Sequence, residues 1–439
     1  MEHYDLIVIG FGKAGKTLAG KMAQLGKRVA LIEQNDHMYG GTCINIGCIP
    51  TKSLIVAAES NTTFEQAMEH KDTVVSRLRQ KNENALTSSG AVLYNGKARF
   101  LANKTILIEA GSDRLELEGE TIVINTGAVS NQFPIPGLAD SHHVVDSTGL
   151  LSVKEQPQRL AIIGGGNIGL EFASLYAKLG SQVVVYEAAP EILGRYEPSV
   201  AKLAKRYLEE DGITFHLSAS VEEVSNNEAG QVLVKANGET EAFDLLLYAM
   251  GRKPATEDLG LENTDITVTD RGAIAVDDYC QTSVEGVYAV GDVTGGPQFT
   301  YTSLDDFRIV LGQLTGASTY NHKERGPIPT TTFIEPPLSQ VGLTEKEAQE
   351  KGIPYKANEL LVANMPRAHV NNDLRGLFKV LINTNTKEVL GATLLGAQSQ
   401  EYINLIKMAI DNHIPYTYLK NQIFTHPSMA ENLNDVFNI

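Results

Sequence analysis

Short apolar runs, each followed by glycine or polar residues, set the pattern of this chain. LIVI (residues 6–9) and VALI (29–32) are two such runs. Runs of this length and composition suit buried parallel strands. Residues 5–34 therefore predict a strand, a glycine turn, a helix and a second strand. The same order recurs at residues 159–188, where LAII and VVVY are the apolar runs.

Three glycines follow the first predicted strand in the order G-x-G-x-x-G, namely Gly10, Gly12 and Gly15. In a strand–turn–helix unit, the first glycine permits a tight turn and the second lets the backbone approach a pyrophosphate. The third lets helix and strand pack closely, and the pyrophosphate lies at the helix N-terminus. Glu33 ends the second strand, where its carboxylate can accept a hydrogen bond from a ribose hydroxyl.

A second copy of this motif makes the interpretation specific. It contains Gly164, Gly166 and Gly169, and the following strand ends at Glu187. The first glycine and the acid are 23 residues apart in both copies (33 − 10 and 187 − 164). One copy is a weak signal, but two copies in complete strand–helix–strand context predict two dinucleotide-binding folds. A carboxylate at position 187 repels a 2′-phosphate, so we expect NADH in preference to NADPH.

The pattern changes towards the C-terminus. Further strands are expected in 121–128, 245–256 and 286–295. From about residue 326, turn residues separate antiparallel strands, and an amphipathic helix follows at 399–412. We therefore predict an α/β protein with two Rossmann-like dinucleotide-binding domains and a C-terminal α+β domain, joined by the link 315–326.

Composition excludes several classes. The 439 residues suggest two to four domains. A net charge of −16 argues against a general nucleic-acid or anionic-membrane binder. The N-terminal residues lack the features of a signal peptide, and no apolar run reaches the length of a spanning helix, so we expect a cytoplasmic protein. Three cysteines do not form a secreted disulfide framework.

Two of the cysteines, Cys43 and Cys48, lie in YGGTCINIGCIPTK (residues 39–52). The two cysteines lack the second pair of ligands that a structural metal site needs, and a structural disulfide is uncommon in the cytosol. A redox role for the pair is therefore favoured. In a straight helix, residues five apart have Cα atoms roughly 8.6 Å apart, too far for a disulfide. A bend is therefore predicted, which Gly47 and Pro50 permit. A helix N-terminus here would favour a thiolate. No metal is expected, and Cys280 is expected to be a bystander.

The chain resembles the class I pyridine nucleotide–disulfide oxidoreductases, which include glutathione reductase, dihydrolipoamide dehydrogenase and mercuric reductase. The resemblance covers essentially the whole chain and implies a glutathione reductase-like fold. It rests on six segments in the expected order: GGTCINIGCIPTK, NTGA, GGGNIGLEFA, YAMGRKPAT, YAVGD and FTHPSMAENL.

This resemblance implies a role for each matching residue. Cys43 would be the thiol that meets substrate, and Cys48 the thiol beside the flavin of FAD. Lys52 and Glu171 would form an ion pair near the reactive flavin nitrogen.

The C-terminal motif carries a further implied role. His426 and Glu431 would form an acid–base dyad, supplied across the interface of a homodimer.

The implied cofactor contacts fall into two sets. The residues expected to bind FAD are Gly10, Gly12, Gly15, Glu33, Thr42, Lys52, Thr126, Gly127, Gly291 and Asp292. Those expected to bind NAD(P)H are Gly164, Gly166, Gly169, Glu171, Glu187 and Gly251. The expected domains are an FAD-binding domain (1–147), an NAD(P)H-binding domain (148–272), a return segment of the FAD-binding domain (273–325) and an interface domain (326–439).

Several segments, among them GFGKAGKTLA, QFTYTSLDDFRIV and MPRAHV, resemble the bacterial reactive chlorine species resistance reductases. Members of that group from mucosal bacteria act as hypothiocyanous acid reductases, so the implied substrate is a small oxidant. No cysteine follows Cys280, whereas mercuric reductases carry a C-terminal cysteine pair. Dihydrolipoamide dehydrogenase or a reductase of small disulfides is the alternative enzyme, and a nucleotide-bound redox sensor is a third hypothesis.

Overall fold

The computed structural model describes residues 1–60 and 62–439, which divide into two compact units. The first unit comprises Met1–Gln132, Ser147–Lys154 and Gly251–Arg325. The second comprises Phe133–Asp146, Glu155–Met250 and Gly326–Ile439. Among the described residues, no helix combines the length and the apolar character needed to cross a membrane.

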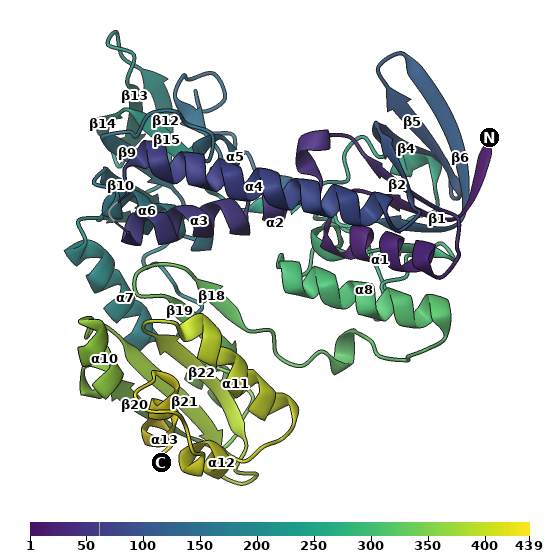
Figure 1. Ribbon diagram of the computed structural model, residues 1–439. Coiled ribbons are helices and arrows are strands. Elements are labelled where there is room, and N and C mark those ends of the chain that lie inside the picture. Colours follow the sequence, from purple (N-terminus) through teal and green to yellow (C-terminus); the bar gives the residue numbers. More distant parts are fainter. Residues whose placement is uncertain (61) are drawn as a thin grey trace. The chain divides into compact units, whose positions relative to one another are not determined.

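Parallel strands form the centre of the first unit (Figure 1). Their order in the sheet is β3, β2, β1, β6 and β17. The strands are β1 (Glu2–Ile9), β2 (Val29–Glu33), β3 (Val92–Asn95), β6 (Asp113–Ile124) and β17 (Val287–Ala289). Both apolar runs predicted from the N-terminal motif are confirmed as neighbouring parallel strands.

Helices and a hairpin cover the two faces of this sheet. Side chains alternate along a strand, so Leu6 and Val8 pack under the helices α1 (Lys13–Gln24) and α8 (Thr300–Thr315). Ile7 and Ile9 face the opposite side. Figure 1 shows α1 and α8 side by side.

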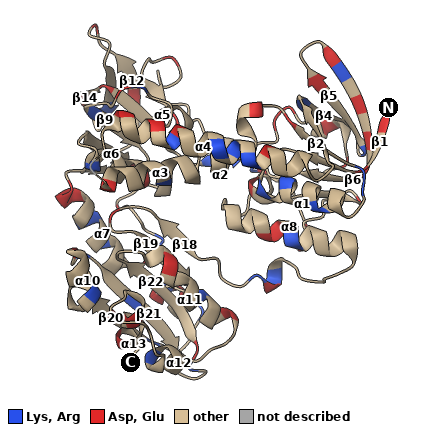
Figure 2. Ribbon diagram, in the orientation of Figure 1, with Lys and Arg blue, Asp and Glu red and all other residues tan. Residues whose placement is uncertain are grey.

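The opposite face carries an antiparallel extension that the sequence pattern did not predict. β4 (Lys97–Ala102) pairs with β5 (Thr105–Ala110), which pairs with the first half of β6. Figure 2 shows charged residues of both signs on the β5–β6 hairpin, where Arg114 pairs with Glu109 at 3.1 Å. The short strands β7 (Ala128–Ser130) and β16 (Arg252–Pro254) form a separate pair.

Helices follow the second strand of this unit. They are α2 (Thr42–Asn45), α3 (Cys48–Glu59), α4 (Phe64–Thr87) and, later in the chain, α5 (Ser147–Leu150). Thr63 caps α4 by accepting from the backbone N–H of Gln66, whose side chain accepts from the backbone N–H of Thr63 in return. α3 packs against α4 and is thereby held in place.

The second unit repeats the strand–turn–helix–strand arrangement. Its parallel sheet has the order β11, β10, β9, β15 and β8. The strands are β8 (Val144–Val145), β9 (Arg159–Ile163), β10 (Gln182–Glu187), β11 (Thr214–Leu217) and β15 (Leu245–Tyr248). The helices are α6 (Asn167–Lys178) and α7 (Pro198–Glu210). An antiparallel sheet covers one face, formed by β12 (Val221–Asn226), β13 (Val232–Ala236) and β14 (Glu239–Phe243).

The C-terminal segment forms an antiparallel sheet with the order β18, β19, β22, β21 and β20, as the turn residues predicted. Its strands are β18 (Thr330–Thr332), β19 (Leu338–Gly342), β20 (Tyr355–Leu361), β21 (Leu377–Asn383) and β22 (Val389–Leu395). Its helices are α9 (Glu345–Glu350), α10 (Pro366–Asn371), α11 (Ser399–Asp411), α12 (Tyr416–Asn421) and α13 (Leu433–Val436). The predicted amphipathic helix is α11, which packs on β19 and β22 (Figure 1). The expected domain boundaries stay a prediction.

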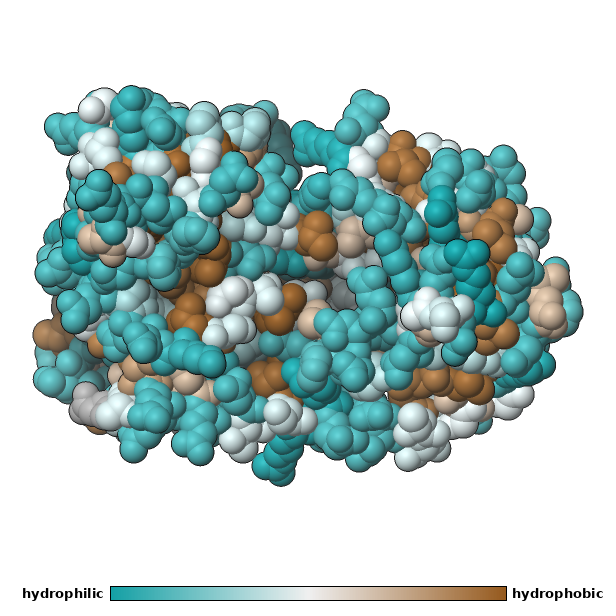
Figure 3. Space-filling model, turned by 90° about the horizontal axis from the view of Figure 1, so that it is seen from above, coloured by the Kyte–Doolittle hydropathy of each residue, from teal (hydrophilic) through white to brown (hydrophobic). Residues whose placement is uncertain are grey.

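With most large apolar side chains buried in the core, the surface that remains is mainly polar. Figure 3 shows a face on which hydrophilic residues predominate and hydrophobic ones form small, separate groups.

Lys379 is a buried charged residue of the second unit. It pairs with Glu197 at 3.1 Å, Glu359 at 3.3 Å and Glu345 at 3.5 Å. These pairs join the residue before α7, the neighbouring strand β20 and the helix α9 to Lys379 on β21, and such buried charges require their partners.

Gly169→Ala tests the close packing of α6 on β9. The new Cβ would lie 2.0 Å from the carbonyl oxygen of Gly164, and overpacking of this kind costs about 1–3 kcal/mol. We expect G169A to lower the midpoint of thermal unfolding of the purified protein. Gly166→Ala is the matched control, because its Cβ would meet no atom within 4 Å. Equal midpoints for the two variants would contradict the packing argument.

Candidate active site

The first glycine turn is built by contact with the end of β6. Gly10 has φ +98°, and a Cβ there would lie 2.4 Å from the carbonyl oxygen of Asn125. A Cβ on Gly15 would lie 2.7 Å from Val8, so glycine permits α1 to pack on β1. Gly12 precedes the first turn of α1, where backbone N–H groups are available to an anion.

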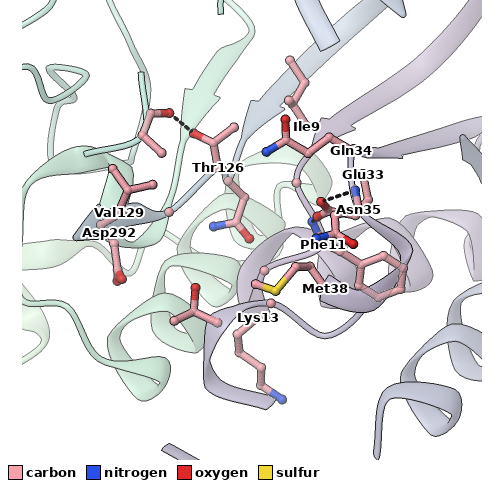
Figure 4. Close-up of a pocket in the computed structure, with 18 of the residues that line it drawn as sticks. Ile9, Phe11, Lys13, Glu33, Gln34, Asn35, Met38, Thr126, Val129 and Asp292 are labelled. Atoms are coloured by element: carbon pink, nitrogen blue, oxygen red, sulfur yellow. Dashed lines mark hydrogen bonds between the residues drawn. The ribbon is translucent and has the colours of Figure 1, made fainter. Parts of the chain in front are cut away.

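Glu33 closes this turn from the neighbouring strand. Its Oε2 accepts from the backbone N–H of Phe11 at 2.9 Å, and its Oε1 accepts from that of Asn35 at 3.1 Å. Burial raises the pKa of Glu33, and the backbone N–H groups oppose the shift. Figure 4 shows the carboxylate between Phe11 and Asn35. Each carboxylate oxygen keeps a further lone pair for a ribose hydroxyl.

A cavity of about 450 Å³ lies at the carboxyl ends of these strands, within the size range of ligand pockets. The residues predicted to bind FAD that line it are Gly10, Gly12, Glu33, Thr42, Thr126, Gly127 and Asp292, and both Cys43 and Cys48 line it as well. Figure 4 shows Glu33, Thr126 and Asp292 around it, on three different segments. Gly15 lies behind the turn, Gly291 is buried beside Ser303, and Lys52 lies on α3.

The cysteine pair lies at a break between two helices. Cys43 is in α2, Cys48 is the first residue of α3, and Gly47 between them has φ −135° and ψ −114°. Pro50 lies in the first turn of α3. The bend predicted from the five-residue spacing is therefore confirmed, and both residues are thiols here, with their side chains hydrogen-bonded to each other.

The two thiols have different surroundings. Cys48 is exposed at the N-terminus of a twelve-residue helix, where the peptide dipoles favour a thiolate. The hydrogen bond with Cys48, together with burial, raises the pKa of Cys43. Thr300 and the charge of Lys16 oppose that shift in part. The expected helix N-terminus therefore serves Cys48 rather than Cys43.

The far side of the cavity carries Thr126 and Asp292. Thr126 Oγ1 donates to the carbonyl oxygen of Ala255 at 2.8 Å, which Figure 4 marks. Burial raises the pKa of Asp292, and the positive charge of Arg252 opposes the shift. A buried carboxyl of this kind favours a hydroxyl-bearing partner.

The second unit holds the other glycine turn. Gly164 has φ +109°, and a Cβ there would lie 2.6 Å from the carbonyl oxygen of Ala249. Glu187 Oε2 accepts from the backbone N–H of Gly165 at 2.6 Å, and its Oε1 accepts from that of Ala189 at 2.8 Å. Glu187 therefore repeats the arrangement of Glu33 around its own turn.

Two other predicted NAD(P)H contacts lie apart from this turn. Glu171 is buried on α6, where it accepts from the backbone N–H of Phe333 at 3.0 Å. Gly251 belongs to the first unit. Lys52 and Glu171 belong to different units. Their pairing, and the NAD(P)H contact of Gly251, stay predictions.

The C-terminal dyad is formed within the second unit. His426 Nδ1 lies 2.8 Å from Glu431 Oε2, and Glu431 Oε1 accepts from the backbone N–H of Ser428 at 3.0 Å. Burial disfavours the charge on Glu431, but the hydrogen bonds from His426 and Ser428 outweigh it and lower the pKa of Glu431. The ring of His426 is exposed.

Two cavity residues, Asn125 and Thr300, were not predicted from the sequence, and neither was Lys16, whose charge acts on Cys43. Asn125 Oδ1 accepts from the backbone N–H of Gly15 at 2.9 Å, and its Nδ2 donates to the carbonyl oxygen of Val290 at 2.8 Å. The sequence feature that could have indicated Asn125 is a polar residue directly after the run TIVI. Thr300 Oγ1 lies 3.9 Å from Cys48 Sγ, and no local pattern marks it. Burial lowers the pKa of Lys16 to about 8, and only its place in the glycine motif distinguishes it.

Comparison with known proteins identifies the family of this chain. Residues 4–306 match the pyridine nucleotide-disulphide oxidoreductase family model, and residues 328–437 match its dimerisation domain. The chain belongs to the pyridine nucleotide-disulphide oxidoreductase family. It is therefore an oxidoreductase of the flavoprotein disulfide type, with the glutathione reductase-like fold predicted from the sequence.

Individual members of the family are similar over their full length. A probable pyridine nucleotide-disulfide oxidoreductase, RclA of Escherichia coli, is 47% identical over 100% of both chains. Dihydrolipoyl dehydrogenase of Chlamydia trachomatis is 32% identical over 98% of this chain and 95% of its own. A solved structure of the C43S mutant of RclA from Escherichia coli, a Cu(II) complex of an HOCl-induced flavoprotein disulfide reductase, has a TM-score of 0.98 at 46% identity, covering 100% of both chains.

Family membership implies FAD and NAD(P)H as cofactors, and the cavity of the first unit fits the first of these. Its glycine turn lets a pyrophosphate approach the N-terminus of α1, Glu33 suits the adenosine ribose, and Asp292 suits the hydroxyl groups of the flavin side chain. Both cysteines line the same cavity. FAD, when bound, supplies two-electron transfer between a nicotinamide and the cysteine pair.

Cys43→Ser tests which sulfur lies beside the flavin. Without Cys43 no disulfide can form, so Cys48 remains a thiol at the N-terminus of α3. We expect FAD-loaded C43S to show a long-wavelength thiolate–flavin absorption band that strengthens as pH rises, because the thiolate is the absorbing form. Cys48→Ser is the matched control and should show no band. A band in C48S and not in C43S would reverse the assignment.

Proposed function

We propose that this enzyme reduces hypothiocyanous acid to thiocyanate and water at the expense of NADH. The observation that carries the proposal is the pair of thiols that line one cavity with the predicted flavin contacts. The similarity to RclA over the full length supports a small oxidant as substrate, because its solved structures are described as an HOCl-induced reductase. A small oxidant needs an accessible sulfur rather than a large pocket.

The chemistry assigns one step to each thiol. Cys43 forms a bond to the sulfur of hypothiocyanous acid, and the S–O bond breaks to release hydroxide, which leaves as water. Cys48 then attacks Cys43, so a disulfide forms and thiocyanate leaves. One thiol, one thiolate and one hypothiocyanous acid thus give one disulfide, one water and one thiocyanate. The two sulfurs lose two electrons, and the oxidant gains them.

The proton on Cys43 gives His426 its role in this proposal. The hydrogen bond with Cys48 and burial raise the pKa of Cys43, so a base that takes its proton would promote the attack. His426, oriented by Glu431, has the ordinary chemistry for this transfer. The imidazole takes the proton from Cys43 and returns it to the departing hydroxide. This proposal includes a homodimer in which His426 of one subunit serves Cys43 of the other.

The homodimer is supported by the C-terminal segment. The dimerisation-domain model matches residues 328–437. Large apolar side chains are exposed there without a covering element in the chain: Leu405, Met408, Tyr418 and Ile423. Ile423 is 92% exposed, three residues before His426. Exposed apolar side chains of this size would suit a protein–protein contact, so we assign 326–439 to the interface and retain the other expected domain boundaries.

Parallel turnover assays test the substrate. Purified FAD-loaded enzyme with NADH should reduce hypothiocyanous acid with kcat/KM at least about 100-fold above that for lipoamide or glutathione disulfide, a ratio that selective sites reach. The matched control is C43S, which keeps the fold and lacks the attacking sulfur. Faster turnover of lipoamide would identify a dihydrolipoamide dehydrogenase. NADH binding without turnover of any acceptor would favour the redox sensor.

Glu187→Gln tests the nicotinamide preference. Gln retains the shape but removes the charge that repels a 2′-phosphate, so we expect the NADH-to-NADPH ratio of kcat/KM to fall about tenfold, equal to about 1.4 kcal/mol. Steady-state kinetics with both nucleotides measure the ratio. Glu191→Gln, an exposed acid four residues later, is the matched control. An unchanged ratio in E187Q would remove Glu187 from cofactor selection.

A further inference from the structure

Three side chains behind the cofactor cavity converge on one point. Cys280 lies before β17, Asp306 lies on α8, and His322 begins the 3₁₀ turn His322–Glu324. Cys280 Sγ is 3.3 Å from His322 Nε2, which is 3.1 Å from Asp306 Oδ1. All three atoms lie within 4.8 Å of one another. Within residues 1–60 and 62–439, no other three His, Cys, Asp or Glu side chains meet in this way.

The arrangement differs from that of a nucleophilic triad. In a relay of cysteine, histidine and aspartate, the acid contacts one ring nitrogen and the nucleophile contacts the other. Here the same nitrogen, Nε2, faces both Cys280 and Asp306. Cys280 is also fully buried, so a substrate does not reach its sulfur. Three potential ligand atoms that lie within 4.8 Å of one another can instead form a ligand set.

The distances fit a tetrahedral metal ion. With bonds of about 2.0–2.1 Å to nitrogen and oxygen and about 2.3 Å to sulfur, tetrahedral ligand atoms lie roughly 3.3–3.6 Å apart. The two closest pairs, at 3.1 Å and 3.3 Å, need to open by only a few tenths of an ångström. Thiolate, imidazole and carboxylate together suit zinc, whereas calcium and magnesium require oxygen ligands.

The charges around the cluster are mainly negative. Burial raises the pKa of Cys280, Asp306 adds to the shift, and the positive charge of Arg325 opposes it. Arg325 donates from Nη2 to Asp306 and from Nε to Asp305 at 2.7 Å. The pair with Asp305 holds Arg325 while Asp306 serves as a ligand. A divalent cation offsets the remaining negative charge and converts the thiol into a thiolate.

We propose that Cys280, Asp306 and His322 bind a zinc ion, with water as the fourth ligand on the exposed side of His322. The ion has a structural role. Asp306 Oδ2 accepts from the backbone N–H of Gly291 at 2.7 Å, and Gly291 precedes Asp292 in the cofactor cavity. Zinc therefore ties α8 and the segment after it to the turn that presents Asp292.

Cobalt(II) is the probe, because a thiolate bound to it gives a charge-transfer band and tetrahedral sites give visible ligand-field bands. The FAD-loaded variant Cys43→Ser/Cys48→Ser removes the other two thiols. We expect one cobalt per chain with both kinds of band, displaced by added zinc. We also expect zinc to raise the midpoint of thermal unfolding of this variant.

Further substitutions in the same background separate the site from other metal binding. Cys280→Ser should abolish the thiolate band and the zinc-induced rise in unfolding midpoint. His322→Gln should weaken cobalt binding at least about tenfold. If C280S does not retain its flavin, this variant serves in its place as the test of the site. His70→Gln, an exposed histidine of the same unit, is the matched control. Failure to bind cobalt, or a thiolate band that persists in C280S, would overturn the proposal.

Discussion

The carboxyl ends of three strands, β1, β6 and β17, are held together by one buried residue, Asn125. Its backbone N–H donates to Ile9 at 2.7 Å, while its side chain bonds Gly15 and Val290. Each partner lies on a different segment, and a buried amide that loses a partner costs about 1–3 kcal/mol. The glycine turn, Thr126 and the turn bearing Asp292 follow directly from these bonds. Asn125 therefore joins segments that border the cavity, which it also lines.

Local pattern was enough to predict the elements that end at this edge, but not the contacts between them. The runs LIVI, VALI, LAII and VVVY are short and apolar, and glycine motifs follow the first of each pair, so strands and turns were evident. β17 lies more than 160 residues after β6, and nothing in either segment specifies their pairing. Thr300 and Asn125 acquire their roles from that pairing. The β4–β5 hairpin went unpredicted because it extends a sheet whose edge only the fold defines.

The cysteine pair also shows which features local sequence predicts and which depend on the fold. The five-residue spacing required a bend through chain geometry alone, and Gly47 supplies it. The spacing could not indicate which thiol ionises, because that depends on burial and on the partner. α2 is a single short turn, whereas α3 offers a full helix N-terminus to Cys48. The hydrogen bond with Cys48 and burial raise the pKa of Cys43, so a base would promote the attack that we propose for this sulfur.

The turn after β17 joins the cavity to the cluster behind it. Val290 accepts from Asn125 on the cavity side, and Gly291 donates to Asp306 on the other. Hydrogen bonds to two adjacent residues therefore fix the backbone on both sides of this turn. Asp292 is the next residue, and it lines the cavity. A zinc ion at the proposed site would join Asp306 of α8 to Cys280 and His322, while Asp306 Oδ2 accepts from Gly291. An ion in that place would act on the turn that carries Asp292, which lines the cavity.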